Sequence, residues 1–475
     1  MNYPKIAGFK TLDAFRDYLR QESIDIPLAE DGVTQAMAQP LNCSGRTVGN
    51  RWSILPMEGW DCSADGSPTD LTRRRWLRFA RSGAKLLYGT EAAAVMHSGR
   101  SNPNQLMAAE HTRESLTTLC RDMHNAHRSA FGRDDDLLIG LQLTHSGRFS
   151  HPNKPDVLES QNAYAHPLLD RKFGAGHVVT DDEVRDIVRH YIAAAKIAQV
   201  AGFDFVDIKQ AHGYLGHEFL TAHDRLGPYG GCFENRTRFF REICEGIRRE
   251  CPGLILSSRL SIFDIFPFVK GPDGLGQPMA WDPTIPYPYA FGGDGTGLGM
   301  DPQLDEPVAF VKLMREYGID LICGTIGSPY YNVHMQRPAY FPVTDGYLAP
   351  QNPLYNVSRH LLAEKRLKEK CPWIHVVASG LTCLQDFLPN AAEAAVTNGT
   401  VDFAGIGRMV LSYHDFCADA LAGKKLDRCR ICRTFGDCTN APRNGLVSGC
   451  YPLDDFYKHM PEAETLKAVK KNSKT

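Results

Sequence analysis

Short apolar runs alternate with amphipathic stretches along most of the chain, from residue 50 to about residue 415. Runs such as residues 137–143 and 203–208 are typical of buried strands. The stretches between them repeat apolar residues at helical spacing, and the clearest one begins with a capping box, Thr180 to Glu183, and ends at Gly202. The other predicted strands are residues 52–55, 84–88, 254–256, 319–323, 375–379 and 401–405, and the other predicted helices are residues 11–19, 71–81, 111–131, 235–249 and 309–317.

This alternation predicts an α/β protein in which crossover helices connect parallel strands. About eight such units over this length favour a closed (β/α)8 TIM barrel. An open doubly wound sheet is the alternative, but no G-x-G-x-x-G motif follows the first strand. We expect residues 1–49 to form an N-terminal helix and lead-in segment, residues 50–424 to form the barrel, and residues 425–475 to form a small cysteine-containing extension.

One segment interrupts the alternation. Residues 263–307 are rich in glycine and proline and follow a predicted strand directly. In a barrel this position lies on the catalytic face, so we expect a long loop that serves as a lid or binding loop. A solvated insertion is the alternative. The basic end of the chain, residues 467–475, is expected to be frayed.

Composition and charge favour a small molecule as the partner. Hydrophobic residues make up 43% of the 475 positions, and the formal net charge is −2, so no basic field is expected to attract nucleic acid or anionic lipid. No apolar run approaches the roughly 20 residues that cross a bilayer, and no signal peptide is visible. Of the 14 cysteines, ten are scattered singly, which fits a reducing compartment. We therefore expect a soluble, cytoplasmic protein.

The most informative side chains lie in residues 207–220. Lys209, His212 and Tyr214 follow a predicted strand, at the position where barrel enzymes place their chemistry. Lys209 and His212 could bind one substrate oxygen, and Tyr214 could deliver a proton close by. From spacing alone, a surface turn with a hydrogen-bonded histidine explains the same residues equally well.

A much longer part of the sequence resembles the Old Yellow Enzyme family of flavin oxidoreductases. The run from His212 through Tyr214 is similar to the family signature, and residues 225–231 and 234–239 are similar to the motifs that follow it. Segments similar to six further family strands occur in the family's order, so the resemblance covers about residues 50–415. It is strongest to the 2,4-dienoyl-CoA reductase and trimethylamine dehydrogenase branch. The resemblance implies a barrel that binds FMN non-covalently.

The resemblance also implies which residues hold the cofactor. Gln142 would pair with the flavin pyrimidine, because an amide offers both donors and an acceptor. Arg259 would face flavin N1 and O2, where reduced flavin carries negative charge. Gly380 and Gly407 would let backbone amides approach the phosphate, and Arg408 would add charge. Taken singly, each of these has a structural alternative. The predicted cofactor set is completed by Pro56, Met57, Ala92 and Ser379.

Two residues depart from the family pattern. Lys209 stands where members usually carry histidine or another neutral hydrogen-bonding residue. A protonated lysine there favours an anionic or strongly polarised substrate oxygen, or a changed substrate class. Glu58 follows Pro56 and Met57 beside the expected flavin, where a carboxylate opposes flavin reduction unless a cation such as Lys209 pairs with it. Alternatively, Glu58 points away into a polar network.

Four cysteines near the end of the chain are clustered. Their spacing is Cys429-x2-Cys432-x5-Cys438-x11-Cys450. In the related branch a four-cysteine set at this place holds a [4Fe–4S] cluster, although the middle gap is longer here. Four thiolates suit such a cluster or a structural zinc ion, and free thiols in a docking segment are the remaining alternative.

The combined prediction is an FMN-dependent oxidoreductase of the Old Yellow Enzyme type. Hydride would pass between flavin N5 and a small organic substrate, in enone or enoyl-like reduction or in amine or C–H dehydrogenation. NAD(P)H or an electron-transfer protein would reduce the flavin, because no dinucleotide-binding domain follows the barrel in this sequence. We also expect a homo-oligomer. The alternatives are a barrel lyase with Lys209 as a Schiff base and a non-catalytic flavin or iron–sulfur electron carrier.

Overall fold

The computed structural model describes residues 3–30, 35–297 and 303–472. Parallel strands close into a ring in the order β4, β3, β15, β14, β13, β10, β9 and β6, and β6 pairs back to β4. The predicted TIM barrel is therefore confirmed. The ring consists of β3 (Trp52–Ile54), β4 (Leu86–Leu87), β6 (Leu138–Thr144), β9 (Phe205–Ile208), β10 (Ile255–Phe263), β13 (Leu321–Ile326), β14 (His375–Ala378) and β15 (Phe403–Ile406), and β5 (Ala92–Ala94) also pairs with β6.

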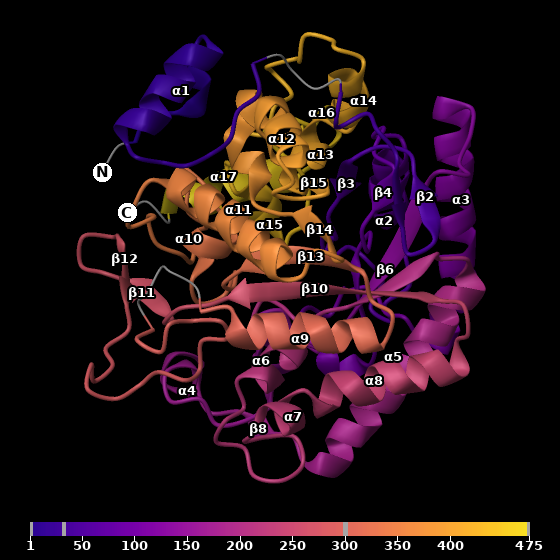
Figure 1. The fold of residues 1–475 in the computed structure, drawn as a ribbon, viewed down its shortest axis with the longest axis vertical. Coiled ribbons are helices and arrows are strands. Elements are labelled where there is room, and N and C mark those ends of the chain that lie inside the picture. The colour runs from indigo at the N-terminus through magenta and orange to yellow at the C-terminus, as the bar shows by residue number, and fades with distance from the viewer. Residues whose placement is uncertain (1–2, 31–34, 298–302, 473–475) are drawn as a thin grey trace.

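Helices surround the ring, as the amphipathic stretches predict (Figure 1). The long ones are α2 (Asp70–Ala80), α3 (Arg113–Phe131), α5 (Asp181–Ala201), α8 (Arg238–Glu250), α9 (Asp305–Glu316), α11 (Pro353–Lys370) and α12 (Leu388–Thr397). The capping box at Thr180 opens α5, and Gly202 ends it in the left-handed region, both as predicted. The predicted helix at residues 235–249 is divided at Thr237 into α7 (Phe233–Arg236) and α8. Among the described residues, no helix combines the length and apolar character needed to cross a membrane.

Smaller elements connect and cover these layers. The helical ones are α1 (Leu12–Gln21), α4 (Leu169–Phe173), α6 (Leu215–Leu220), α10 (Val333–Gln336), α13 (Arg408–Ser412) and α14 (Phe416–Leu421), with 3₁₀ turns at Ile6–Gly8, His97–Gly99, Glu110–Thr112, Gly147–Phe149 and Leu381–Phe387. The two-stranded pairs are β1 (Leu41–Cys43) with β2 (Arg46–Val48), β7 (Gln161–Asn162) with β8 (His177–Val178), and β11 (Phe268–Lys270) with β12 (Gly276–Pro278).

The amino-terminal end of the barrel is closed by the β1–β2 hairpin. Cys43 and Val48 pack into the core inside the ring, together with residues such as Phe205 and Phe403. The Ser44 amide donates to Asp320 Oδ2 (3.1 Å), directly before β13. The hairpin thus plugs one end, and the carboxyl ends of the strands are left to form a site.

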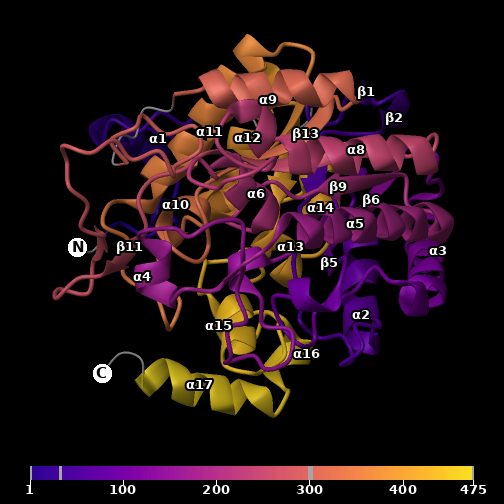
Figure 2. The ribbon, with the colours of Figure 1, turned by 90° about the horizontal axis from the view of Figure 1, so that it is seen from below.

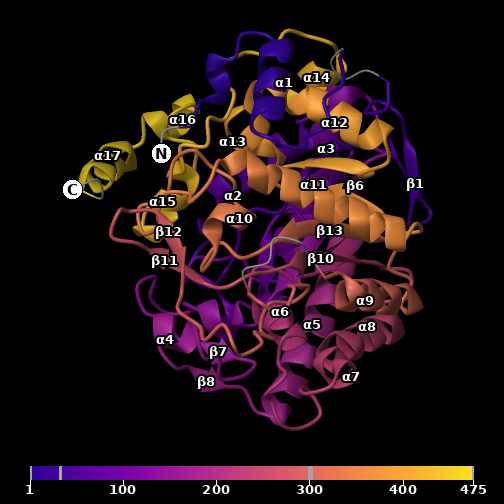
Figure 3. The ribbon, with the colours of Figure 1, turned by 60° about the vertical axis from the view of Figure 1, so that its left-hand side comes forward.

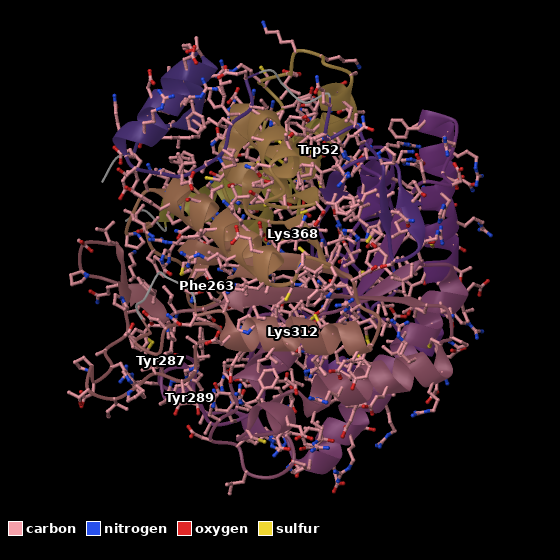
Figure 4. The ribbon with its side chains drawn as sticks, viewed as in Figure 1. Trp52, Phe263, Tyr287, Tyr289, Lys312 and Lys368 are labelled. Atoms are coloured by element: carbon pink, nitrogen blue, oxygen red, sulfur yellow. The ribbon has the colours of Figure 1, made fainter. Side chains whose placement is uncertain are left out.

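The insertion after β10 is more ordered than the sequence suggests. It contains the β11–β12 hairpin and buries Tyr287 and Phe291. Figure 4 places Tyr287 and Tyr289 beside each other and far from Trp52 in β3. Asp264 accepts hydrogen bonds from Tyr331 and Asn332, which ties the insertion to the segment after β13. Residues 298–302, which belong to the predicted loop, lie outside the described residues.

The C-terminal extension lies against one side of the barrel. It carries α15 (Asp437–Arg443), α16 (Asp455–Lys458) and α17 (Glu462–Asn472), and Figures 2 and 3 both show α15–α17 gathered there. The frayed tail predicted for residues 467–475 is wrong as far as residue 472, because α17 continues to there and Leu466 packs on Tyr451 and Tyr457. The domain boundaries proposed from the sequence remain predictions.

Candidate active site

A cavity with two connected lobes lies at the carboxyl ends of the barrel strands. We call them the β14–β15 lobe, which encloses about 1010 Å³ and opens to solvent, and the β9 lobe, which encloses about 700 Å³. Every residue predicted to act in catalysis or to bind the cofactor lines at least one lobe. The residues that line both are Pro56, Glu58, His212, Arg259, Gln336, Cys438 and Thr439. None of the described residues of the 263–307 insertion lines either lobe, and a role of this segment as a lid or binding loop stays a prediction.

The catalytic segment after β9 is fixed on both sides. The His212 amide donates to Ser261 Oγ (3.0 Å), and Ser328 Oγ donates to the His212 carbonyl oxygen (2.6 Å). His212 has a φ of 70°, which is rare for a residue other than glycine and is held here by these contacts. Tyr214 then caps α6. The chain turn thereby directs Lys209, His212 and Tyr214 into the β9 lobe, as predicted.

Glu58 is the centre of a hydrogen-bond network in this lobe. Its carboxylate accepts from Ser101 Oγ (2.6 Å), Trp60 Nε1 (2.9 Å), Tyr214 OH (3.1 Å) and Lys209 Nζ (3.3 Å). The pairing with Lys209 that the sequence suggested is therefore present. The Glu58 side chain lines the cavity within this polar network, so it does not point away from the site.

Burial sets the protonation of the catalytic groups. It lowers the pKa of Lys209 to about 8, against the opposing effect of Glu58, so the amine is mostly protonated at neutral pH. Burial, helped by Arg259 and Lys209, lowers the pKa of His212 well below its usual value, which leaves a neutral imidazole. Burial and Glu58 raise the pKa of Tyr214 well above 10, so the phenol keeps its proton. Tyr214 OH also lies 2.8 Å from Tyr330 OH.

Gln142 and Arg259 are both organised by one buried carboxylate. Gln142 Nε2 donates to Asp207, which leaves Gln142 Oε1 as the acceptor for a ligand in the lobe. The Arg259 amide donates to the other Asp207 oxygen (2.5 Å). Burial raises the pKa of Asp207 to about 6. Sequence reasoning missed Asp207, although it directly precedes the catalytic segment on β9.

The residues at the cavity fit a flavin mononucleotide. Arg259 Nε and Arg408 Nη1 are buried polar atoms without a hydrogen-bond partner in the structure, so they are available to a ligand. Gly380 has a φ of 80°, and a Cβ atom there would approach the His360 ring to 3.0 Å. Gly405 has even less space for a side chain, since a Cβ atom there would come within 2.2 Å of the Ala378 carbonyl oxygen. The backbones of β14 and β15 thus approach each other closely beside Arg408, whose Nη1 atom has no hydrogen-bond partner, and this arrangement suits a phosphate.

Two segments contribute residues that sequence reasoning did not find. The chain after β13 supplies Tyr330, Gln336 and Arg337, and the C-terminal extension supplies Thr439 and Arg443. The Gln336 amide contacts His212 Nε2 (3.1 Å). No motif marked these residues, because the segment after β13 lies between the motifs at residues 258–261 and 378–380, and the extension lies beyond the resemblance.

The four clustered cysteines differ in their surroundings. Cys432 and Cys450 are buried, Cys438 is half-buried and lines the cavity, and Cys429 is exposed. Cys432 and Cys438 both help to raise the pKa of Cys450, so these three thiols lie near one another. Arg337 Nη2 donates to Cys438 Sγ (3.5 Å). Among the described residues, no three of these sulfur atoms lie within 4.8 Å of one another, and Cys429 is exposed, so the described geometry does not itself form a metal site.

Comparison with known proteins agrees with this geometry. Residues 37–271 match the NADH:flavin oxidoreductase / NADH oxidase family. The NADPH dehydrogenase of Bacillus subtilis (strain 168) is 27% identical over 301 residues, which cover 62% of this chain and 75% of the relative. An NADH:flavin oxidoreductase of Gibberella zeae is 30% identical over 232 residues, which cover 45% of this chain and 53% of the relative.

Solved structures support the fold. An old yellow enzyme homologue from Zymomonas mobilis superimposes with a TM-score of 0.56 at 19% identity, covering 83% of this chain and 94% of the other. A 2-naphthoyl-CoA reductase gives 0.64 at 16% identity, covering 91% and 58%. A histamine dehydrogenase from Rhizobium sp. 4-9 gives 0.60 at 18%, covering 88% and 52%. The chain therefore spans little more than half of the last two proteins.

The fold and the site together define a flavin-binding TIM-barrel oxidoreductase. The chain belongs to the NADH:flavin oxidoreductase / NADH oxidase family, which includes the Old Yellow Enzymes, and it is an FMN-dependent enzyme. The family implies NAD(P)H as the source of electrons.

Proposed function

We propose that this enzyme reduces a carbon–carbon double bond that is conjugated to a carbonyl group, as in an enone or an enoyl compound. The observation that carries the proposal is the set of donors in the β9 lobe: Lys209 and Tyr214 both bind Glu58, and His212 lines the same lobe. Donors of this kind match a substrate oxygen that gains negative charge as the double bond is reduced.

Each side chain has a separate task in this proposal. FMN, when bound, supplies hydride from its N5 to the carbon distal to the carbonyl. The protonated Lys209 and the His212 ring hold the carbonyl oxygen and stabilise the charge that develops there. Tyr214, which keeps its proton because burial raises its pKa, donates that proton to the neighbouring carbon. Tyr330 is in hydrogen-bond contact with Tyr214 and lies in position to return a proton to the Tyr214 oxygen.

The other interpretations have less support. Amine dehydrogenation requires a binding place for a cation, but the Glu58 carboxylate already accepts from four donors, one of them a lysine. The lyase hypothesis uses Lys209 as a nucleophile, which its pKa of about 8 permits, yet it gives Gln142 and Arg259 no task. A non-catalytic electron carrier would not need Tyr214 in the cavity. Borohydride trapping on Lys209 and turnover of an enone separate these alternatives.

The Tyr214→Phe variant tests the proposal. We expect the step in which reduced flavin reduces the enone to slow by about 10²- to 10⁴-fold, because a positioned proton donor contributes that much. Reduction of the flavin by NAD(P)H and FMN binding should be unchanged, since the phenol is not placed against the cofactor phosphate. Stopped-flow absorbance of the two half-reactions measures this, and an unchanged rate of substrate reduction would refute the role of Tyr214.

The four cysteines remain a candidate site for a [4Fe–4S] cluster or for zinc. Burial of Cys432 and Cys450 supports a bound group, and the exposed Cys429 is the weakest member of the set. A cluster would give an electron-transfer protein a route to the flavin. Iron, acid-labile sulfide and zinc contents of the purified protein, with Cys429→Ser as the comparison, distinguish cluster, zinc and free thiols. The homo-oligomer expected from the sequence remains a prediction, which sedimentation analysis of the purified protein tests.

A further inference from the structure

Arg337 is a guanidinium in the cavity that sequence reasoning gave no role. It follows α10, lines the β14–β15 lobe together with Ser379, Gly380 and Arg408, and its recorded polar contact is the Cys438 thiol. Within the described parts of the chain, no carboxylate forms an ion pair with it. A guanidinium in a protein is charged at neutral pH.

The arginines that line the cavity fall into two groups. Arg75 is paired with Asp61 and Glu91, and Arg443 is paired with Asp345. Arg259, Arg337 and Arg408 have no such partner among the described residues. Arg259 is buried and Arg337 and Arg408 are half-buried, and removing a cation from water without a counter-ion costs free energy unless a ligand supplies the negative charge. The second group therefore marks where an anion binds.

The chain holds Arg337 and Arg408 side by side. Arg408 Nη2 donates to the carbonyl oxygen of Pro338, the residue that follows Arg337 (2.9 Å). Arg408 Nη1 is left without a partner. The two guanidinium groups carry like charges and repel each other. An anion with a charge near −2 would balance both of them. The phosphate monoester of FMN has that charge at neutral pH.

We propose that Arg337 and Arg408 form a paired-guanidinium clamp for the FMN phosphate, so that the cradle at the ends of β14 and β15 has a second arm from the segment after β13. Arg259 remains the cation for the flavin ring. This inference rests on the flavin binding of the proposed function and extends it to a residue that no resemblance assigns.

The test compares FMN with riboflavin, which lacks the phosphate. Apoprotein is titrated with each flavin, and binding is followed by flavin fluorescence. In Arg337→Gln we expect FMN affinity to fall by about 10- to 100-fold, the value of a hydrogen bond between charged groups. Riboflavin affinity should change less than about twofold, since riboflavin makes no phosphate contact. Arg408→Gln should behave in the same way.

Arg433→Gln is the matched control. Arg433 is a half-buried arginine of the C-terminal extension. Other residues of this extension line the cavity, but Arg433 is paired with Asp386 and lines neither lobe. Its FMN-to-riboflavin affinity ratio should equal that of the unaltered protein. Inorganic phosphate should strengthen riboflavin binding in the unaltered protein and not in Arg337→Gln. Arg337→Lys keeps the positive charge but loses the two-pronged guanidinium, so its FMN-to-riboflavin affinity ratio should lie between those of the unaltered protein and of Arg337→Gln.

Several outcomes would overturn the clamp. An unchanged affinity ratio in Arg337→Gln would do so, as would equal losses for both flavins, which would mean that Arg337 supports the fold of the lobe. If Arg337→Gln does not yield folded protein, the ratio in Arg337→Lys decides the question. Failure of the unaltered protein to bind either flavin would instead refute the proposed function. A changed ratio in Arg408→Gln alone would refute only the role of Arg337.

Discussion

The two lobes of the cavity handle charge in opposite ways. Among the described residues, Arg337 and Arg408 of the β14–β15 lobe have no carboxylate partner, whereas Lys209 of the β9 lobe is paired with Glu58, and Arg259 lies where the lobes meet. Buried cations without partners call for an anionic ligand, and a neutralised lobe lined with donors calls for a neutral, polarised one. The contrast indicates that charge anchors the cofactor and that hydrogen bonds select the substrate.

Removal of the charge at the junction of the lobes should have the largest effect. Arg259→Gln should slow flavin reduction by NAD(P)H by about 10²- to 10³-fold, because a fixed cation near the developing negative charge is lost. The flavin reduction potential should become more negative for the same reason. Stopped-flow bleaching of the flavin and a potentiometric titration measure the two changes.

Arg259→Lys is the comparison for this prediction. Lysine keeps the positive charge, so the flavin reduction potential should stay close to that of the unaltered protein, even if flavin reduction by NAD(P)H is slower. If Arg259→Gln leaves the reduction potential unchanged, the guanidinium does not face the flavin ring, and the assignment of charge to the cofactor loses its main support.

The internal pairing in the β9 lobe can be broken at Glu58. Because Glu58 raises the pKa of Lys209 against burial, Glu58→Gln should lower that pKa from about 8. Lys209 would then lose its proton at lower pH, so the alkaline limb of the pH profile for enone reduction should move down by about one unit. At pH 9 activity should fall by about tenfold, since well above its pKa the protonated fraction changes tenfold per pKa unit, whereas at pH 7 it should fall by only about twofold.

Ser101→Ala provides the control for the Glu58 variant. It removes a neutral hydrogen bond to the same carboxylate and no charge, so the alkaline limb should stay in place. Movement of the limb in both variants, or in neither, would show that the Lys209–Glu58 pair does not set the protonation that reduction requires.

The sequence predicted one kind of feature well. The barrel and the placement of Gln142, Arg259 and Arg408 around one cavity follow from strand ends, where a motif and a parallel register together fix a position. Arg259 lies within β10 itself, so its place follows from its position along a single strand. The capping box at Thr180 is local for the same reason.

The features that were missed depend on contacts between distant segments. Arg337 reaches the phosphate cradle only because Pro338 meets Arg408, 70 residues further along the chain. The order of the 263–307 insertion depends on Asp264, which binds Tyr331 and Asn332. The extension that supplies Arg443 carries no periodic pattern that would place it over the barrel. Spacing along one segment holds no information about such contacts.

Gln336 gives the smallest and most selective test of the contrast between the lobes. It is the neighbour of Arg337, but its amide contacts His212 Nε2 in the β9 lobe. Gln336→Leu should raise KM for the enone by about 2- to 10-fold, the value of one neutral hydrogen bond, with a smaller change in kcat. FMN affinity should be unaffected, in contrast to the effect of Arg337→Gln one residue further on. Steady-state kinetics and flavin titration of the two variants check this, and Gln336→Glu, which keeps the length but has no N–H to donate to His212 Nε2, should not recover the KM. A loss of FMN affinity in Gln336→Leu would show that the segment after β13 acts as a unit, and the division of labour between the lobes would not extend to single residues.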